Sequence, residues 1–399
     1  MTAYFVSFVL AMVLAFAVTP LARRAAIRLD IVDHPGGRKA HLSPVPYLGG
    51  VAIYAAFIAI LVLAMATVAH DSDYAQALGQ LLAIVGGASL MALMGLCDDR
   101  YDLPPGVKLL GQLAGAGILI AAQVEIHINT PMFRPLEAPI TVLWVVGITN
   151  AFNFMDNMDG LAVGTAGIAS SFFFLHAILS LPVQTLVASL AAALGGASFG
   201  FLFYNWSPAK IFMGDAGSLF LGYMLAALGL KLSLTTASPQ LQALANQAGY
   251  ATNVTQSIHA VALVAPLFVL GVPIFDTTLA VVSRLRRGVP ITRGGRDHVS
   301  HRLVGSGMSH REAVMTLYLA SCALGGVSIA LTRATVQEGT TILGVALVVG
   351  VYFFFRFEQM YSQQARSEAA AQATAAATHP EHGVANPAVG ASSRVESLT

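Results

Sequence analysis

The chain has 399 residues and a formal net charge of +1, and 56% of its residues are hydrophobic while only 10% are charged. A soluble domain is roughly 45–50% apolar and about a quarter charged, so this composition predicts an integral membrane protein. The small net charge provides no basic field for nucleic acid, which we exclude as a partner. Cys97 and Cys322 lie in separate apolar runs, which excludes a disulfide framework and a cysteine metal site.

Apolar runs recur along the chain at about the 20 residues that a bilayer-crossing helix needs. They predict an all-α polytopic protein with about eleven transmembrane helices, near residues 3–20, 48–69, 80–97, 107–123, 138–151, 160–180, 183–203, 216–233, 259–283, 311–332 and 338–356. The first run lacks a charged segment before it and a cleavage site after it, so we interpret it as a retained span. Residues 1–360 are expected to form a single integral-membrane domain. Residues 361–399, rich in Ala, Ser, Gln and Thr, are expected to be a low-complexity, disordered tail.

Basic residues are unevenly divided among the predicted loops. Loops numbered odd from the N-terminus, together with the C-terminal tail, hold eighteen of the 21 Lys and Arg residues. The even-numbered loops hold only Arg134, Lys231 and Arg333. The positive-inside rule therefore predicts a cytoplasmic C-terminus and an N-terminus outside. The aspartates and histidines that are candidates for chemistry fall in or beside the cytoplasmic loops.

Two clusters of oxygen-bearing side chains follow predicted spans. Asp98 and Asp99 come directly after the third span, where carboxylates are costly unless they are solvated or paired. They form either a solvated helix end or a general base or metal site, and we favour the site. Asn153, Asp156 and Asp159 follow the fifth span at a spacing of three, which suits Mg2+ or polyol hydroxyls. A capped turn is the alternative, but a cap needs only one acid.

Two further motifs combine glycine, aromatic and basic residues. Asp215 opens the eighth span, where Gly214 and Gly217 either serve a simple helix cap or let the backbone approach a phosphate closely. Phe212 is the nearest aromatic residue and is a candidate for stacking on a base. In the largest predicted cytoplasmic loop, residues 296–302 hold two Arg and two His, a cationic patch suited to a pyrophosphate.

Taken in chain order, these motifs resemble the polyprenyl-phosphate N-acetylhexosamine-1-phosphate transferases of glycosyltransferase family 4. The resemblance extends from about residue 30 to residue 325 and is carried by residues 38–41, 46–50, 98–99, 153–160, 213–218 and 297–302. The run Arg-Lys-Ala-His at 38–41 and the form Asp-Asp-Arg-Tyr-Asp at 98–102 are similar to the bacterial undecaprenyl-phosphate GlcNAc-1-phosphate transferase branch. Phospho-MurNAc-pentapeptide translocases, and transferases for another UDP-N-acetyl sugar, are the alternatives. That branch usually has His-x-His-His where this chain has Ser300 in place of the middle histidine.

The resemblance implies a role for each motif. Mg2+, or alternatively Mn2+, is the implied cofactor, with Asp215 as its principal ligand and Asn153 and Asp156 shaping the metal and phosphate environment. Asp98, with Asp99 beside it, is implied to face the polyprenyl phosphate. The residues implied to contact the donor are Asp159, Asn205 and Phe212 for the uracil, and His298, His301 and Arg302 for the pyrophosphate or sugar.

The implied reaction moves GlcNAc-1-phosphate from a UDP-sugar onto undecaprenyl phosphate and releases UMP, at the cytoplasmic face of a bacterial inner membrane. The acceptor phosphate carries about −1.5 to −2 charge at pH 7, so repulsion between two anions is the main obstacle. Mg2+, Lys210 and Arg302 are expected to offset it. Direct attack by the lipid phosphate and a covalent aspartyl intermediate both stay open, as does a homodimer.

A secondary transporter is the rival from another class, and it predicts acids near the middle of its spans. Asp276 is the one acid near a span interior, and we interpret it as a packing or helix-end residue.

Overall fold

A computed structural model describes residues 1–33, 44–67, 74–127, 131–180, 183–236, 264–291, 295 and 297–378. This part of the chain is a bundle of long helices with one short antiparallel hairpin, β1 (Val32–Asp33) and β2 (Val45–Pro46). The helices are α1 (Thr2–Arg28), α2 (Gly49–Thr67), α3 (Tyr74–Tyr101), α4 (Pro105–Ala121), η1 (Pro131–Leu136), α5 (Glu137–Met155), α6 (Leu161–Leu179), α7 (Thr185–Asn205), α8 (Gly214–Thr236), α11 (Gly271–Arg286), α12 (Val299–Gly305), α13 (His310–Leu331) and α14 (Val336–Thr378).

A bilayer offers no hydrogen-bond partners to the backbone, and each helix pairs its own N–H and C=O groups. An apolar chain therefore folds into helices in a membrane. Eight helices of the described part are long and apolar enough to cross a membrane, and residues 49–63 and 105–121 form shorter apolar helices. Each predicted span overlaps a helix, although the first residues of the ninth span lie outside the described residues. The prediction of an all-α polytopic membrane protein is confirmed.

Helix α8 forms the centre of the bundle, because 89% of its most apolar window is buried. It packs against α3 and α5, and also against α2 and α6. Close packing elsewhere depends on glycine, as is usual between membrane helices. A Cβ added at Gly196 of α7 would lie 2.1 Å from the carbonyl oxygen of Phe8 in α1. Bulkier residues there would force α1 and α7 apart.

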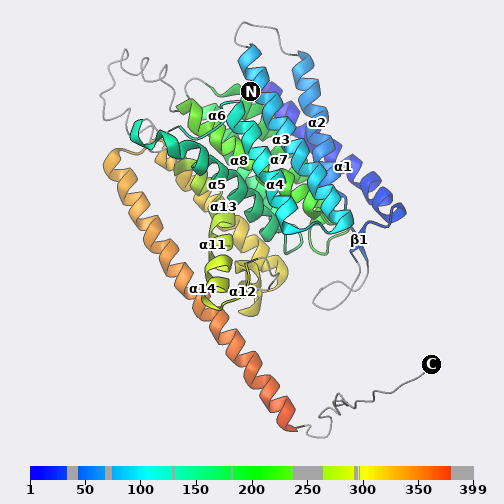
Figure 1. Ribbon diagram of the computed structural model, residues 1–399, viewed down its shortest axis with the longest axis vertical. Helices are drawn as coiled ribbons and strands as arrows, with labels where there is room; N and C mark the ends of the chain where they lie inside the picture. The colour runs from blue at the N-terminus through cyan, green and yellow to red at the C-terminus, as the bar shows by residue number, and fades with distance from the viewer. Residues whose placement is uncertain are drawn as a thin grey trace, which may run out of the picture.

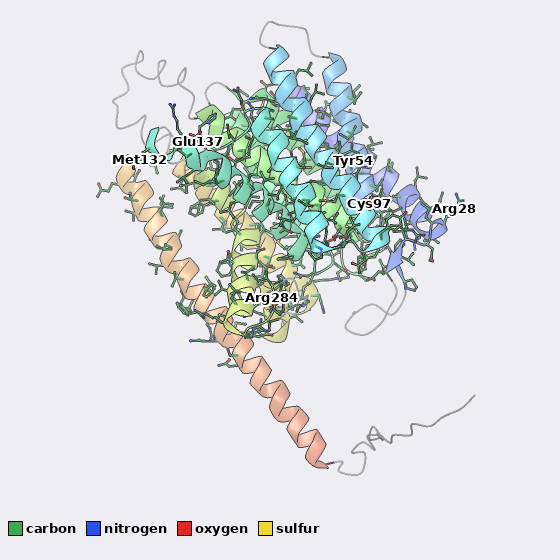
Figure 2. The ribbon with its side chains drawn as sticks, in the orientation of Figure 1. Arg28, Tyr54, Cys97, Met132, Glu137 and Arg284 are labelled. Carbon is green, nitrogen blue, oxygen red and sulfur yellow. The ribbon has the colours of Figure 1, made fainter. Side chains whose placement is uncertain are left out.

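One end of the bundle collects the polar motifs, and we call it the polar end. Helices α3 and α5 finish there, α8 begins there, and the hairpin and α12 lie there, in the lower part of Figure 1. Figure 2 places Arg284, near the end of α11, at this end, whereas Glu137 at the start of α5 lies on the far side. Backbone hydrogen bonds join the hairpin and the start of α2 to the residues just before α8, from Phe212 N to Pro46 O at 2.8 Å and from Gly50 N to Met213 O at 2.8 Å.

Helix α14 continues to Thr378, through part of the segment that the sequence suggests is disordered. Its Ala, Glu and Gln residues are strong helix formers, so local propensity favours a helix there. Residues 379–399 lie outside the described part. The division into a membrane domain and a tail stays a prediction.

Candidate active site

A lysine that bridges two carboxylates forms the centre of the polar end. Asp98 ends α3, Lys108 lies in the first turn of α4, and Asp215 lies in the first turn of α8. Lys108 Nζ lies 2.7 Å from Asp98 Oδ2 and 3.2 Å from Asp215 Oδ2. Lys108 therefore lies between two carboxylates whose negative charges act on each other. Leu103 N donates to Asp98 Oδ1 at 2.7 Å, which fixes the Asp98 side chain.

Asp99, unlike its neighbour Asp98, caps the start of helix α8 from the end of helix α3. Its carboxylate accepts from the backbone of Asp215 at 2.7 Å and of Ala216 at 3.1 Å. These amides belong to the first turn of α8 and have no partner within their own helix. Gly214 has φ +70, and a Cβ there would lie 2.5 Å from Asp99 Oδ2, so glycine is required for this approach. The cap fixes the position of Asp215; a catalytic role for Asp99 stays a prediction.

Asn153 and Asp156 reach the same centre from the end of α5. Asn153 Nδ2 donates to Asp215 Oδ1 at 2.8 Å and to Ser218 Oγ at 3.0 Å. Burial, followed by the charges of Asp215, Asp99 and Asp159, raises the pKa of the Asp156 carboxyl to about 8. The structure therefore brings together the residues predicted to surround a metal and phosphate, and their carboxylates carry more negative charge than Lys108 offsets.

This arrangement fits a divalent cation that is shared with substrate. Mg2+ in phosphoryl-transfer sites is typically held by one or two carboxylates, with water and substrate phosphates completing its shell. Asp98, Asp156 and Asp215 supply carboxylates of that kind. Across the described ranges, no three His, Cys, Asp or Glu side chains lie together in a way that could hold a metal ion by themselves. A cation here would need oxygens from the substrate.

Two residues predicted to bind uracil instead join loops. Asn205 is buried; its Oδ1 accepts from Gly160 N at 3.0 Å and its Nδ2 donates to Ile211 O at 3.0 Å. Asp159 Oδ2 accepts from Ala209 N at 3.0 Å. These contacts hold residues 156–160, the α5–α6 loop, against residues 206–213, the α7–α8 loop. Asp159 is only half-buried and keeps a second oxygen for other partners.

The α7–α8 loop is also fixed from outside. Arg23 of α1 donates to Lys210 O at 3.1 Å, and Arg311 of α13 donates to Ser207 O at 2.7 Å. The Lys210 side chain itself is exposed, and Lys108 rather than Lys210 lies among the acids. Phe212 is half-buried, with its ring centroid 6.0 Å from that of Tyr47. The two rings form an aromatic surface three residues before Asp215.

Helices α11 and α12 form a second, buried polar network. Asp276 Oδ2 lies 2.7 Å from His298 Nδ1, and Asp276 Oδ1 accepts from Val299 N at 2.6 Å. Arg284 Nη2 lies 3.4 Å from His298 Nε2, so both ring nitrogens face protein groups. The ring also meets Phe154 of α5 edge-on, with centroids 6.3 Å apart. His298 is therefore a buried link between α11, α12 and α5, and its catalytic role stays a prediction.

Asp297 is the charged partner of this network. Arg284 donates to both of its carboxylate oxygens at 2.8 Å, and Arg287 donates to Oδ2 at 2.8 Å. Burial alone would raise the pKa of the Asp297 carboxyl, but the bonds and charge of Arg284, with the charge of His298 and a bond from Arg287, lower it to about 2. The bonds from Arg284 and Arg287 to Asp297 hold the segment before α12 against the end of α11.

Arg302, predicted to be a pyrophosphate ligand, is held by protein groups on several sides. Its side chain is fully buried, and its Nε donates to Asp297 O at 2.8 Å. Its Nη1 donates to Phe357 O at 2.8 Å and to Glu358 Oε1 at 3.0 Å. A guanidinium enclosed in this way joins α12 to α14, and its predicted contact with the pyrophosphate stays a prediction. His301 is half-buried, while residues 38–41 and Arg296 lie outside the described residues.

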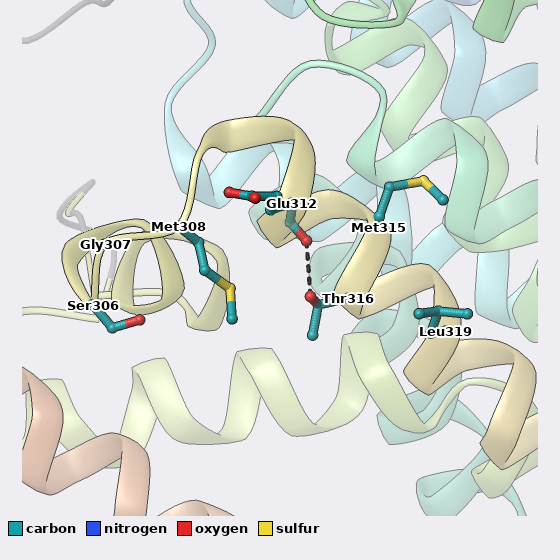
Figure 3. Close-up of a pocket in the computed structure, with 7 residues that line it drawn as sticks. All are labelled: Ser306, Gly307, Met308, Glu312, Met315, Thr316 and Leu319. Atoms are coloured by element: carbon teal, nitrogen blue, oxygen red, sulfur yellow. Dashed lines mark hydrogen bonds between the residues drawn. The ribbon is translucent and has the colours of Figure 1, made fainter.

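An open hollow of about 560 Å³ lies between the end of α12 and α13. Figure 3 shows its lining residues, Ser306, Gly307, Met308, Glu312, Met315, Thr316 and Leu319. Glu312 is engaged in a capping box with Ser309 at the start of α13. The lining supplies no cation for a phosphate and none of the carboxylates of the polar end, so we do not assign a substrate to this hollow.

Comparison with known proteins identifies the family. Residues 81–233 match the model of glycosyl transferase family 4. A relative from Bacillus subtilis (strain 168), a probable undecaprenyl-phosphate N-acetylglucosaminyl 1-phosphate transferase, is 33% identical over 350 residues, covering 86% of this chain and 89% of the relative. This chain belongs to glycosyl transferase family 4.

Other relatives in glycosyl transferase family 4 carry related names. A decaprenyl-phosphate N-acetylglucosaminephosphotransferase from Mycolicibacterium smegmatis is 32% identical, covering 86% of this chain and 85% of the relative. An undecaprenyl-phosphate alpha-N-acetylglucosaminyl 1-phosphate transferase from Salmonella typhimurium is 27% identical, covering 77% and 78%. The family resemblance expected from the motifs is confirmed.

Sequence reasoning missed three residues of this family-4 site. Lys108 counted only toward membrane orientation, although a lysine in the first turn of the helix that follows the Asp98-Asp99 pair was a usable signal. Asp276 was interpreted as packing, but a buried intramembrane carboxylate calls for a named partner, which is His298. Ser300 was noted only because it replaces the usual middle histidine. Its hydrogen bond to Asn157 at 2.7 Å joins residues far apart in the chain, which the sequence does not reveal.

Proposed function

We propose that this protein transfers GlcNAc-1-phosphate from UDP-GlcNAc to undecaprenyl phosphate, giving the lipid-linked diphosphosugar and UMP. The observation that carries the proposal is the bridged acid pair of Asp98, Lys108 and Asp215 at a helix end, in a chain whose relatives carry this activity in their names. The acids lie where a lipid phosphate at the membrane surface and a water-soluble nucleotide sugar can meet. Product of this kind would initiate a cell-envelope polysaccharide.

The main task of the site is to bring two anions together. Lys108 is placed to offset their repulsion, in the position first expected for Lys210 and Arg302. Asp98 orients Lys108, and Asp99 fixes Asp215 through the start of α8. A bound Mg2+ would be held by Asp215, with Asp156 beside it and substrate oxygens completing its shell, and it would supply charge stabilisation for the phosphates. Asn153 holds Asp215 in place from α5.

The donor has a matching surface beside the acids. The α7–α8 loop is held by Asp159, Asn205, Arg23 and Arg311, so its backbone is fixed before substrate arrives. A planar uracil is expected on the Phe212 side of this loop, because the Phe212 and Tyr47 rings lie there. This keeps the predicted role of Phe212 and makes Asn205 a support for the loop.

We place the polar end in the cytoplasm of a bacterial inner membrane, with eleven crossings and the N-terminus outside. The charge distribution supports this orientation, since eighteen of the 21 Lys and Arg residues lie in the odd-numbered loops and the tail. The start of α1 and the end of α14 lie at opposite ends of the bundle, as an odd number of crossings requires (Figure 1). Asp276 is bonded to His298 within the protein, which disfavours a transported-ion site.

The test is UMP release by the full chain in detergent, with undecaprenyl phosphate, Mg2+ and a panel of UDP-sugars. We expect UMP only when lipid and metal are both present, with UDP-GlcNAc as the best donor. Asp215→Ala should abolish release, whereas Ser321→Ala, in α13 and away from the acids, should not. Absence of UMP with every donor, beside an active control transferase, would overturn the proposal.

A further inference from the structure

The α5–α6 loop, residues 156–160, is held at both of its ends by other helices. At the Gly160 end, Asn205 accepts from Gly160 N at 3.0 Å, and the Tyr318 hydroxyl donates to Gly160 O. At the Asp156 end, Ser300 Oγ of α12 donates to Asn157 Oδ1 at 2.7 Å. Asn157 Nδ2 in turn donates to Phe154 O at 2.9 Å, so its amide is fixed from two sides.

Ser300 belongs to a rigid platform. Its side chain is 0% exposed, and the residues before it are tied to α11 through Asp276, which bonds both His298 and Val299 N. Arg302, two residues later, is tied to α14. A hydroxyl held this firmly constrains its partner, because neither end of the hydrogen bond can move independently.

We propose that Ser300 is a positioning residue, which acts through Asn157 to fix Asp156 against the acid centre. The inference rests on the proposed function, since Asp156 is assigned there to the metal and phosphate environment. Asn157 is the immediate neighbour of Asp156, and Asp156 lies close enough to Asp215 and Asp99 to feel their charges. A small displacement of the α5–α6 loop would therefore move Asp156 relative to the reacting phosphates.

The alternative is that Ser300 only satisfies a buried hydrogen bond. A purely structural hydroxyl would change stability without a selective change in turnover. A positioning hydroxyl lowers kcat, because misplacement of catalytic groups by about 1 Å can cost about 100-fold in rate. Ser321 of α13 is the matched control, since it is also buried and donates only to its own helix, to Leu317 O at 2.9 Å.

The experiment is a double-mutant cycle with Ser300→Ala, Asn157→Ala and the double variant, measured by UMP release. We expect Ser300→Ala to lower kcat about 10-fold with the KM for the donor within about twofold. In the Asn157→Ala background, Ser300→Ala should cost less than about twofold more, because the shared bond is already lost. Ser321→Ala should stay within about twofold of wild type. Additive effects of the two substitutions would overturn the proposal.

A second measurement does not depend on activity. Hydrogen–deuterium exchange of peptides covering residues 154–161 should be faster in Ser300→Ala and unchanged in Ser321→Ala. Unchanged exchange in both variants would overturn the positioning role. If the wild-type protein released no UMP, the proposed function would fail, and the exchange result would still decide whether Ser300 holds the loop.

Discussion

Asp98 and Asp99 are adjacent in sequence, and their contacts predict opposite consequences of mutation. Asp98 bonds Lys108, whose side chain is 25% exposed and can be rehydrated. Asp99 bonds two backbone amides at the start of α8, which have no other partner in their helix. We therefore expect Asp99→Ala to destabilise the fold, and Asp98→Ala to remove activity while the fold persists.

The magnitude follows from the number of groups left without a partner. Loss of a helix cap costs about 1 kcal/mol, and each buried donor left unpaired costs about 1–3 kcal/mol. With two amides exposed to a poorly hydrated helix end, Asp99→Ala should cost about 2–4 kcal/mol. Asp99→Asn keeps one acceptor oxygen and should recover about half of that. Asp98→Ala breaks a partly exposed ion pair and frees the amide of Leu103, which is half-buried and can be rehydrated, so it should cost only about 1 kcal/mol.

The assay combines two readouts on the same purified samples. The temperature at which half of the detergent-solubilised protein remains monodisperse reports stability, and UMP release at a temperature well below that midpoint reports activity. We expect the midpoint to fall in the order wild type, Asp99→Asn, Asp99→Ala, with Asp98→Ala close to wild type and inactive. A wild-type midpoint for Asp99→Ala, or a large loss for Asp98→Ala alone, would refute the assignment of the cap to Asp99.

Three further predictions follow from the same structure. Lys108→Ala should lower kcat about 100- to 1,000-fold, as loss of a single charge-stabilising donor does elsewhere, and Lys108→Arg should recover part of it; equal UMP release by wild type and Lys108→Ala would contradict this. The pKa of Asp297 lies below its unfolded value of 3.8, so its contribution to the stability of the fold is present above about pH 4 and is lost as pH falls toward 2. Asp297→Asn should therefore flatten the loss of stability with falling pH in that window. The same pH dependence of stability in Asp297→Asn and wild type would argue against it. Gln112 and Asn150 lie one helical turn from Lys108 and Asn153, and their side-chain amides donate to each other at 3.3 and 2.6 Å. Either single change to Leu leaves the other amide without its partner, so it should destabilise the fold more than the double change. Strictly additive losses in the thermal midpoint would count against this pairing.

The sequence was informative wherever a pattern has a physical meaning by itself. Apolar runs of about 20 residues must form helices in a bilayer, so the spans could be predicted one by one. Acids at helix ends are costly there, so Asp98, Asp156 and Asp215 could each be named as candidates, and the structure brings them together with Asn153.

What the sequence could not provide was the direction in which each side chain points. Asp99 and Arg302 could be named as candidate site residues, but the sequence did not show that Asp99 caps α8 or that Arg302 bonds α14. Burial and partner choice depend on contacts between segments far apart in the chain, and one sequence holds no direct record of them. The extent of α14 was not predicted for another reason, since composition alone does not separate a helix from a disordered segment.

The most direct test of the central claim is the fate of the donor's β-phosphate. UDP-GlcNAc labelled with ³²P at the β position would be incubated with the full chain, undecaprenyl phosphate and Mg2+, and the lipid and nucleotide fractions separated. Transfer of a phosphosugar predicts that the label enters the lipid fraction in equal amount to the unlabelled UMP released. Label recovered as UDP, with unphosphorylated sugar on the lipid, would contradict the account, because the enzyme would then be breaking the sugar–phosphate bond.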